Sequence, residues 1–336
     1  MNRIRRITLM AAVSLLAACS TPAPRAPATQ ARVDAYVAEA TRLAGEDLKG
    51  LLPLCNAASS TRPPQESVDQ GIATQIARTP PEPGKAFDNL FFVGSAWVSA
   101  WALATPDGVI LIDALNNQLE AVGLIEGGMR KMGLDPASIR YVVVTHGHGD
   151  HYGGVNHLVE RYRTRVVMSD LDWTMTATQL EFASRHWGAP PRRGANDVAV
   201  RNGDNIALGG SRMVFHFTPG HTLGTISPVF EVKSGGRAHR ALLWGGTAFN
   251  FGNNLPRLDS YIEATDRMAA LAEREGIDVM LSNHPGYDGT VAKIATLQRA
   301  PAGANPFVIG TPNVVRSLRV MGACARAQRD RFAMQS

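Results

Sequence analysis

Six histidine and aspartate side chains have the residue types and the spacing needed to bind metal ions. They are His146, His148, Asp150, His151, His221 and His284. Imidazole nitrogens and carboxylate oxygens suit Zn²⁺, and six ligands are enough for two ions with three each and a shared water. The alternatives are a pH-sensing or merely solvated run for the first four, and ordinary loop histidines for the last two.

Each group of these candidates comes just after the C-terminal end of an expected apolar strand. Those strands are expected at residues 141–144, 213–217 and 277–281. Gly147 and Gly149 would let the first loop fold tightly, so that neighbouring side chains can face different metal ions. The sequence therefore predicts a two-metal centre at a place where several strands end.

The remaining pattern predicts two clusters of strands with helices between them. Further strands are expected at residues 87–93, 97–104, 109–112, 165–168, 225–232 and 241–244, and the whole strand before His221 is expected at 212–217. Helices are expected at residues 118–132, 171–183, 259–275, 290–299 and 312–329. This pattern is typical of two mixed β-sheets packed together and flanked by helices, an α/β (α+β) domain of αββα type over residues 85–336.

Residues 1–18 are typical of a secretion signal. A basic start, residues 1–6, precedes an uncharged stretch that is too short to span a bilayer comfortably. The stretch ends in Leu16–Cys19, which resembles the lipobox of bacterial lipoproteins, where the peptide is cut before the cysteine and the cysteine is acylated. With Ser20 next, the resemblance implies a lipid anchor at Cys19 and a periplasmic protein on the outer membrane of a Gram-negative cell. The alternative is an ordinary cleaved signal and a protein secreted to the periplasm.

A tether and an extension are expected between this signal and the main domain. Residues 19–30 are rich in proline and should be extended. Residues 31–84 should form a helical extension, since apolar side chains recur at helical spacing as far as Leu52, with an interruption near Gly45.

Two cysteines, Cys55 and Cys324, remain once Cys19 is assigned to the lipid anchor. In an oxidising compartment such a pair allows a single intramolecular connection. We therefore predict a disulfide between the extension and the last helix, with two separate buried thiols as the alternative.

The charge of the chain argues against nucleic acid as a partner. Lys and Arg number 34 against 29 Asp and Glu, a net charge of +5. Three of the arginines lie in the expected signal, so the mature chain carries only about +2, with no block of like charges. We expect a small-molecule substrate and contact with the membrane through the lipid anchor. No obligate protein partner is evident from the sequence.

From Phe87 to the C-terminus the sequence resembles the metallo-β-lactamase superfamily. The matching motifs are Ile112-Asp113, residues 146–154 (HGHGDHYGG), residues 219–225 (PGHTLGT), residues 244–247 (WGGT) and His284. The resemblance implies two Zn²⁺ per chain, one held by His146, His148 and His221 and the other by Asp150, His151 and His284. It also implies that Asp113 braces the metal loop, for which a plain strand-end turn residue is the alternative.

The segment after the expected strand at 241–244 distinguishes between subfamilies. Glyoxalase II and many lactonases of this fold carry a metal-bridging Asp there, and subclass B1 β-lactamases carry a Cys. This chain has Gly245-Gly246-Thr247 and no carboxylate before Asp259. The ligand set is therefore most similar to that of subclass B3 β-lactamases. Thr247 stands where that subclass usually has Ser, and Gly246 where its relatives often have Asp.

This resemblance implies a zinc-dependent hydrolase that opens the β-lactam ring by attack of a metal-bridging hydroxide, which Asp150 would orient. The alternatives are hydrolysis of a lactone, a thioester or a phosphodiester, an iron-dependent oxidoreductase similar to persulfide dioxygenases, and a metal-binding lipoprotein without catalysis. Thr247 and Asn250 follow a strand end on the expected metal side. They are candidate substrate contacts, with turn capping as the alternative.

Two pairs of residues have less specific signals. Trp97 and Trp101 could flank the cleft, or they could pack in the core, because a spacing of four in a strand puts both on one face. Arg192 and Arg193 lie in a stretch rich in Gly and Pro and could reach an anionic substrate from a flap, but a solvated loop is the alternative.

Overall fold

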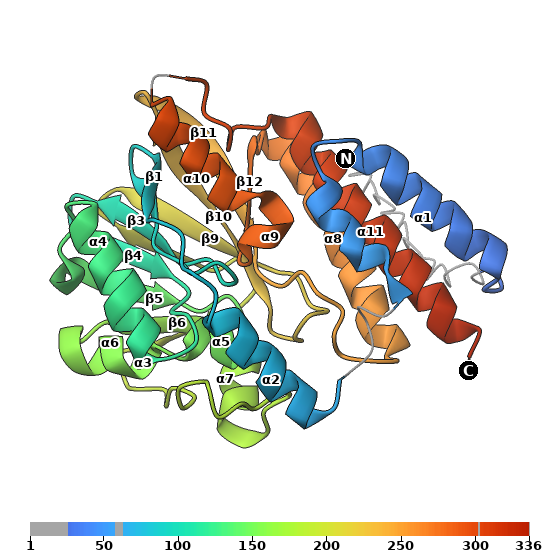
Figure 1. Ribbon diagram of the computed structural model, residues 1–336, viewed down its shortest axis with the longest axis horizontal. Helices are drawn as coiled ribbons and strands as arrows, with labels where there is room; N and C mark the ends of the chain where they lie inside the picture. The colour runs from blue at the N-terminus through green and yellow to red at the C-terminus, as the bar shows by residue number, and fades with distance from the viewer. Residues whose placement is uncertain (1–25, 58–62, 302, 336) are drawn as a thin grey trace, which may run out of the picture.

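Two β-sheets pack face to face, with helices on their outer faces, in the computed structural model (Figure 1), which describes residues 26–57, 63–301 and 303–335. This arrangement confirms the αββα fold predicted from the sequence. The expected signal peptide, Cys19 and the first part of the expected tether lie outside the described residues. Within the described ranges, no helix combines the length and the apolar character needed to cross a membrane.

The first sheet contains seven strands in chain order. They are β1 (Gly84–Phe87), β2 (Leu90–Phe92), β3 (Trp101–Thr105), β4 (Gly108–Ile112), β5 (Ile139–Val143), β6 (Arg165–Ser169) and β7 (Val198–Val200). Strands β1 to β4 pair antiparallel, and β4 to β7 pair parallel. Parallel neighbours end at the same edge of a sheet, so the loops that follow β4, β5 and β6 meet there.

The second sheet contains five strands in the order β12-β11-β10-β9-β8. They are β8 (Asn205–Leu208), β9 (Ser211–Phe217), β10 (Ile226–Ser234), β11 (Arg237–Trp244) and β12 (Val279–Ser282). Only the pair β11 and β12 is parallel. The loops that begin at Gly245 and Asn283 therefore start side by side.

Alternation along β3 and β4 divides the core into two layers. Ile110, Ile112 and Trp101 belong to the buried cluster between the sheets, whereas Val109 and Leu111 belong to the cluster under the outer helices. Successive side chains of a strand point to opposite faces, so a shift of one residue would exchange the two sets. Trp101 is thus a core residue, the second of the two possibilities left open by the sequence.

Helices cover the outer faces of both sheets (Figure 1). On the first sheet lie α3 (Gln118–Glu120), a π-helical segment (Ala121–Glu126), α4 (Gly127–Lys131) and α6 (Val155–Tyr162). On the second sheet lie α8 (Leu255–Glu275) and α11 (Thr311–Ala333), with α1 (Gln30–Ala44) along α11. The other helical segments are η1 (Lys49–Cys55), α2 (Gln65–Ile76), η4 (Pro136–Ser138), α5 (Gly149–Tyr152), α7 (Asp170–Thr178), α9 (Pro285–Asp288) and α10 (Thr290–Arg299).

A disulfide attaches the N-terminal part of the chain to the last helix. Helix α1 ends before Gly45, whose φ of +53° stops the helix, as the sequence predicted. The chain then forms the 3-10 helix η1, and Cys55 at its end is bonded to Cys324 of α11, with the two Cα atoms 4.4 Å apart. The predicted disulfide is confirmed.

Several elements have bounds that differ from the predicted ones. The strand expected at residues 97–104 begins only at Trp101, because the Ser95 hydroxyl accepts hydrogen bonds from the amides of Trp97 (3.1 Å) and Val98 (2.9 Å) and closes a turn there. The helix expected at 171–183 ends at Thr178. Strands β7 and β8, which are short, are absent from the prediction.

Candidate metal centre

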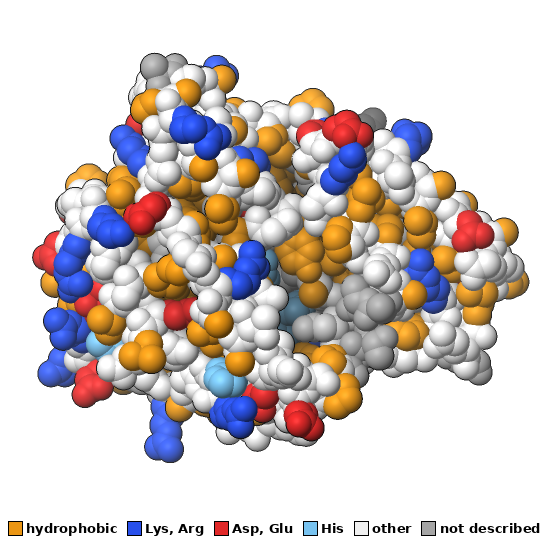
Figure 2. Space-filling model, viewed as in Figure 1, with side chains coloured by type: hydrophobic (Ala, Val, Ile, Leu, Met, Phe, Trp, Pro, Cys, Tyr) orange, Lys and Arg blue, Asp and Glu red, His pale blue; other side chains and the backbone are white. Residues whose placement is uncertain are grey.

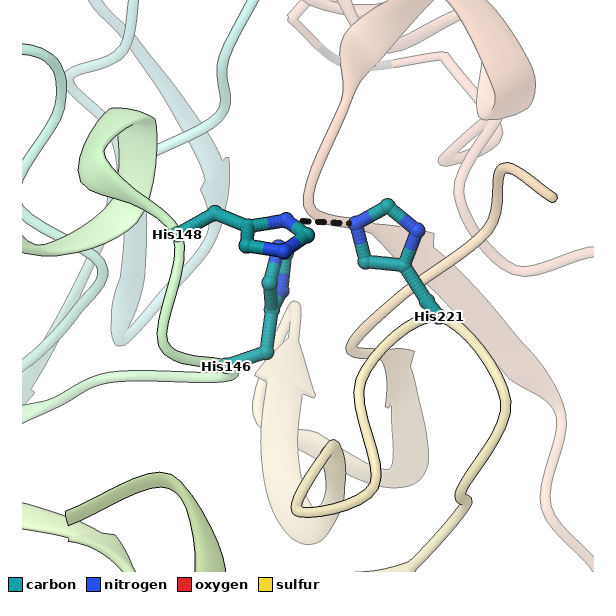
Figure 3. A group of neighbouring side chains, drawn as sticks. All are labelled: His146, His148 and His221. Carbon is teal, nitrogen blue, oxygen red and sulfur yellow. Dashed lines mark hydrogen bonds between the residues drawn. The ribbon is translucent and has the colours of Figure 1, made fainter. Parts of the chain in front are cut away.

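The three loops that carry the predicted metal ligands meet at one end of the two sheets. The first loop follows β5, the second connects β9 to β10, and the third follows β12. Figure 3 shows the rings of His146 and His148, from the loop after β5, and of His221, from the loop between β9 and β10, directed toward one another. The fold thus brings together side chains from distant parts of the sequence.

His146, His148 and His221 form the first group of possible ligands. One ligand atom of each lies within 4.8 Å of the others, and Nδ1 of His148 is 3.1 Å from Nε2 of His221. Two nitrogens bound to the same tetrahedral zinc ion lie about 3.3 Å apart, given a zinc–nitrogen distance of about 2.0–2.1 Å. The spacing of this group therefore fits one divalent metal ion.

Asp150, His151 and His284 form a second group beside the first. Oδ2 of Asp150 lies 3.3 Å from Nε2 of His151 and 3.7 Å from Nε2 of His284. The ligand atoms of His146, Asp150 and His151 are also within 4.8 Å of one another, so the two groups are contiguous. All six side chains predicted to bind metal converge on one place.

Backbone carbonyls orient three of the imidazoles. The Nδ1 atoms of His146, His221 and His284 donate to the carbonyl oxygens of Gly245, Ala248 and Trp97, at 2.7, 2.7 and 2.8 Å. A carbonyl oxygen can only accept, so the proton lies on Nδ1 and each Nε2 keeps a lone pair for a metal. Nε2 of His146 is buried and has no hydrogen-bond partner among the described residues, which fits a metal ligand.

Asp113 orients His151 through a carboxylate. Its Oδ2 accepts from Nδ1 of His151 (2.8 Å) and from the hydroxyl of Thr145 (2.9 Å), and its Oδ1 accepts from the Thr145 amide (2.8 Å). Asp113 is buried and has a φ of +61°, a conformation that few residues other than glycine adopt. The structure therefore places Asp113 where a brace of the metal loop would lie.

Two acidic residues that the sequence did not reveal also support these loops. Glu181 accepts from Nε2 of His148 at 3.2 Å, so His148 directs its Nδ1 toward the other ligands. Asp172 accepts from the Gly147 amide and from the Thr222 hydroxyl, both at 2.8 Å, and so joins a loop of the first sheet to a loop of the second. Neither residue belongs to a recognisable motif, and no signal in the sequence could have found them.

Neighbouring side chains approach the backbone of Gly147 and of Gly149. An added Cβ would lie 2.5 Å from the terminal methyl group of Met175 at the first position and 2.4 Å from the Trp187 ring at the second. Neither glycine is among the residues with positive φ. Close packing against the Trp187 ring is therefore the physical reason for Gly149, whereas the flexible end of Met175 could move away from a side chain at position 147.

Burial keeps three of the imidazoles neutral. It lowers the pKa of His146 and of His221 well below the usual range, with neighbouring histidines adding to the effect. It also lowers the pKa of His284 to about 4, and the positive charge of His151 acts in the same direction. Neutral imidazole is the form that binds metals, so these three side chains could accept a cation without first losing a proton.

Asp150 and His151 form an ion pair. Burial alone would raise the pKa of Asp150, but His151 and then His284 hold that pKa well below its usual range. Burial alone would lower the pKa of His151, but the carboxylates of Asp150 and Asp113 raise it to about 10. His151 is therefore protonated at neutral pH in the metal-free protein, and a bound cation would displace that proton.

A cleft of about 590 Å³ opens over these side chains, a size typical of small-molecule sites. It appears in Figure 2 as a hollow near the middle of the face, with histidine at its floor. Its aromatic lining consists of Trp97, Phe182, Trp187 and Tyr287. The N-terminal extension contributes Pro53 of η1 and, from α2 and the residues after it, Val68, Ile72, Gln75 and Arg78.

The structure separates the less specific candidates. Asn250 and Trp97 line the cleft. Thr247 instead lines a different cavity of about 190 Å³, where its hydroxyl lies 3.4 Å from that of Ser282. Arg192 and Arg193 are exposed and do not line the cleft, as expected for the alternative of a solvated loop.

Part of this domain is similar to a known protein family. Residues 98–234 match the model of the metallo-β-lactamase superfamily. The chain is similar to hydroxyacylglutathione hydrolases of Rhodopseudomonas palustris (strain BisB5), 35% identical over 115 residues, and of Bradyrhizobium sp. (strain ORS 278), 27% identical over 150 residues. These alignments cover 33% and 43% of this chain and only 34% and 49% of the two relatives.

Solved structures match over a larger part of the chain. BJP-1, a subclass B3 metallo-β-lactamase of Bradyrhizobium japonicum, has a TM-score of 0.63 and 25% identity, and the match covers 73% of this chain and 92% of that chain. Native FEZ-1 metallo-β-lactamase from Legionella gormanii has a TM-score of 0.62 and 19% identity, covering 77% of this chain and 97% of that one. The second likeness is one of fold alone.

Proposed function

Because this chain contains a domain of the metallo-β-lactamase superfamily, we propose that it is a dizinc hydrolase that opens the β-lactam ring and is most similar to subclass B3 enzymes. The observation that carries the proposal is the donor set. Five histidines and one aspartate converge, and neither a carboxylate nor a cysteine follows β11 before Asp259. Such donors suit two divalent cations that keep open coordination positions.

His146, His148 and His221 would hold one zinc ion, and Asp150, His151 and His284 the other. When bound, two zinc ions supply the Lewis acidity that makes water a nucleophile near neutral pH and that polarises a carbonyl oxygen. The chain itself fixes the direction of each histidine ligand through the hydrogen-bond partner of its other ring nitrogen. A serine or cysteine nucleophile is not required by this proposal.

Asp150 would act on the attacking water as well as on the metal. Its carboxylate lines the cleft, and in the metal-free protein His151 and His284 already hold its pKa low; a bound cation would likewise favour the ionised form. An ionised carboxylate can accept a hydrogen bond from water, orient it toward the scissile carbonyl and take up the proton that it loses. The aromatic side chains around the cleft would limit the access of bulk water to the reacting atoms.

A thioester hydrolase is the second candidate, since the curated relatives are named hydroxyacylglutathione hydrolases. The glyoxalase II pattern has a bridging Asp after the strand that corresponds to β11. Here an added Cβ at Gly246 would lie only 2.6 Å from Cβ of His221 and 3.0 Å from the Thr225 methyl group. A side chain at this position would therefore displace a proposed ligand, which favours the β-lactam over the thioester.

A hydrolysis screen with zinc-loaded protein tests the substrate, with metal content measured on the same sample. The panel contains a penicillin, a carbapenem, an acyl-glutathione thioester, a lactone and a phosphodiester, with His221→Ala as the inactive control. We expect β-lactam turnover that a chelator abolishes and added zinc restores. Cleavage of the thioester, lactone or phosphodiester alone would refute the proposal that a β-lactam is the substrate. One iron per chain together with oxygen consumption would indicate an oxidoreductase instead. Zinc binding without any turnover would indicate a protein that only binds metal.

We also propose that Cys19 carries a lipid that anchors the protein to the outer membrane, which the similarity of Leu16–Cys19 to a lipobox supports. Cells fed labelled palmitate should yield labelled protein in the membrane fraction. Cys19→Ser should remove the label and shift the protein to the soluble periplasmic fraction. Unlabelled wild-type protein in that soluble fraction would indicate an ordinary secretion signal.

A further inference from the structure

Glu181 supports His148 from a segment that lies outside the metal-binding motifs. Its Oε2 is 3.2 Å from Nε2 of His148, and the two side chains are only 21% and 4% exposed. Glu181 follows α7 in a stretch without regular secondary structure. A side chain in such a stretch can orient an imidazole only if another residue keeps that side chain in place.

Arg257 forms a bidentate ion pair with Glu181 through two nitrogens of its guanidinium group. Nη1 lies 2.8 Å from Oε1 of Glu181, and Nη2 lies 2.8 Å from Oε2. Two parallel charge-assisted bonds fix both distance and direction, unlike a contact with a lysine. The Arg257 side chain is only 10% exposed, so solvent weakens this pair less than an ordinary surface ion pair.

The same guanidinium group holds the loop that carries His221. Nε of Arg257 donates to the carbonyl oxygen of Gly220 at 2.5 Å, and Nη2 donates to the carbonyl oxygen of His221. The group also stacks over the Phe251 ring, 4.5 Å from its centre. Arg257 therefore contacts both the support of His148 and the backbone of His221.

The stability of helix α8 does not explain why an arginine occupies position 257. Arg257 lies in the first turn, where Asn254 caps the helix by accepting from the Arg257 amide. Positive charge is disfavoured at a helix N-terminus because the helix dipole is positive there. The favourable contacts of this side chain are with the metal-site loops instead.

We propose that Glu181 and Arg257 are positioning residues that set the geometry of the first metal site by joining His148 to the His221 loop. The inference rests on the proposed two-metal function. His148 and His221 come from loops of different sheets, so their 3.1 Å separation depends on how those loops are held together. Asp172 joins the same two loops elsewhere, and the Glu181–Arg257 pair does so at the side chain of the ligand itself.

Glu181→Gln and Arg257→Lys test this role. The first keeps an acceptor for His148 but removes the charge, and the second keeps the charge but removes the two-pronged contact. For each full-length variant we expect the affinity for one of the two zinc ions to fall by about 10–100-fold, with the other ion unaffected. The measurements are zinc titration in competition with a chromogenic chelator and the absorption spectrum of the Co²⁺-substituted protein.

Glu275→Gln is the matched control. It breaks another arginine–glutamate pair, Arg240–Glu275 at 2.7 Å, at the far end of α8, and should leave both zinc affinities unchanged. Wild-type zinc affinities in both test variants would overturn the proposal. Equal weakening of both ions, together with a lower melting temperature of the metal-free protein, would also overturn it in favour of a general structural role. A wild-type protein that binds no zinc would instead overturn the proposed function, and this inference with it.

Discussion

Replacing Asp113 with Asn should disable the second metal site through the tautomer of His151. Asp113 accepts three hydrogen bonds, from Nδ1 of His151 (2.8 Å), the Thr145 hydroxyl (2.9 Å) and the Thr145 amide (2.8 Å). Asparagine replaces one of the two accepting oxygens with an NH₂ group. At least one of these donors then faces another donor inside the protein, since Asp113 and its partners are almost completely buried.

The expected size of the effect follows from the two ways in which His151 can respond. If the new NH₂ group faces Nδ1, that buried donor remains without an acceptor, and the metal-free protein, in which both nitrogens of His151 carry protons, loses about 1–3 kcal/mol of stability. If the proton that a bound cation displaces then leaves from Nδ1 rather than from Nε2, the bond is repaired but the atom that faces Asp150 can no longer bind metal. Either response should lower the affinity of the protein for one zinc ion by about 10–100-fold.

The assay pairs urea unfolding of the metal-free protein with zinc titration against a chelator, for wild type and Asp113→Asn. Asp135→Asn is a suitable control, because Asp135 is an exposed cap of a 3-10 turn and asparagine caps equally well. An Asp113→Asn protein with wild-type stability and two zinc ions of wild-type affinity would refute the reasoning.

Replacing Cys55 and Cys324 with serine should lower the free energy of unfolding by up to about 5 kcal/mol, since the bridge closes a very long loop; urea unfolding measures this. Gly149→Ala should reduce zinc affinity and cost about 1–3 kcal/mol, because its Cβ would lie 2.4 Å from the Trp187 ring; thermal unfolding with and without zinc measures both. Burial alone would raise the pKa of Glu181, but its ionic partners lower it from 4.5 to about 2. Its contribution to stability is therefore present above pH 4.5 and lost as the pH falls toward 2. Urea midpoints of the metal-free protein should show this loss for wild type and not for Glu181→Gln.

The proposed metal ligands could be found in the sequence because their residue types are diagnostic and their positions follow from strand pairing. The run from His146 to His151 comes directly after a strand of unbroken apolar character. The parallel pairs β4–β5 and β11–β12 then bring the ends of those strands to common edges. Val109 to Ile112 are all apolar, so the sequence predicts a buried strand there, and only the structure shows which side chains face each layer.

The supports of the site could not be found, because each acts through a contact that only the folded chain creates. Asp172 bonds to an amide 25 residues away, and Glu181 to a ring 33 residues away. A single carboxylate has no periodic signature, and the helix expected over residues 171–183 ends at Thr178, so Glu181 lies in a stretch without regular secondary structure. The same reason explains Trp97, whose place beside the cleft depends on a turn that the Ser95 hydroxyl closes.

Helix α2 makes the N-terminal extension part of the cleft, a role that neither its composition nor the family resemblance indicated. Gln65 donates to the Ala183 carbonyl, and the Ser184 hydroxyl donates to Asp69, both at 2.5 Å, so α2 is tied to the loop that follows α7. Ile72 of the same helix lines the cleft. The match to the family model begins only at residue 98. We therefore expect substrate selection in the proposed hydrolase to depend in part on residues outside the matched region, which also excludes the proposed ligand His284.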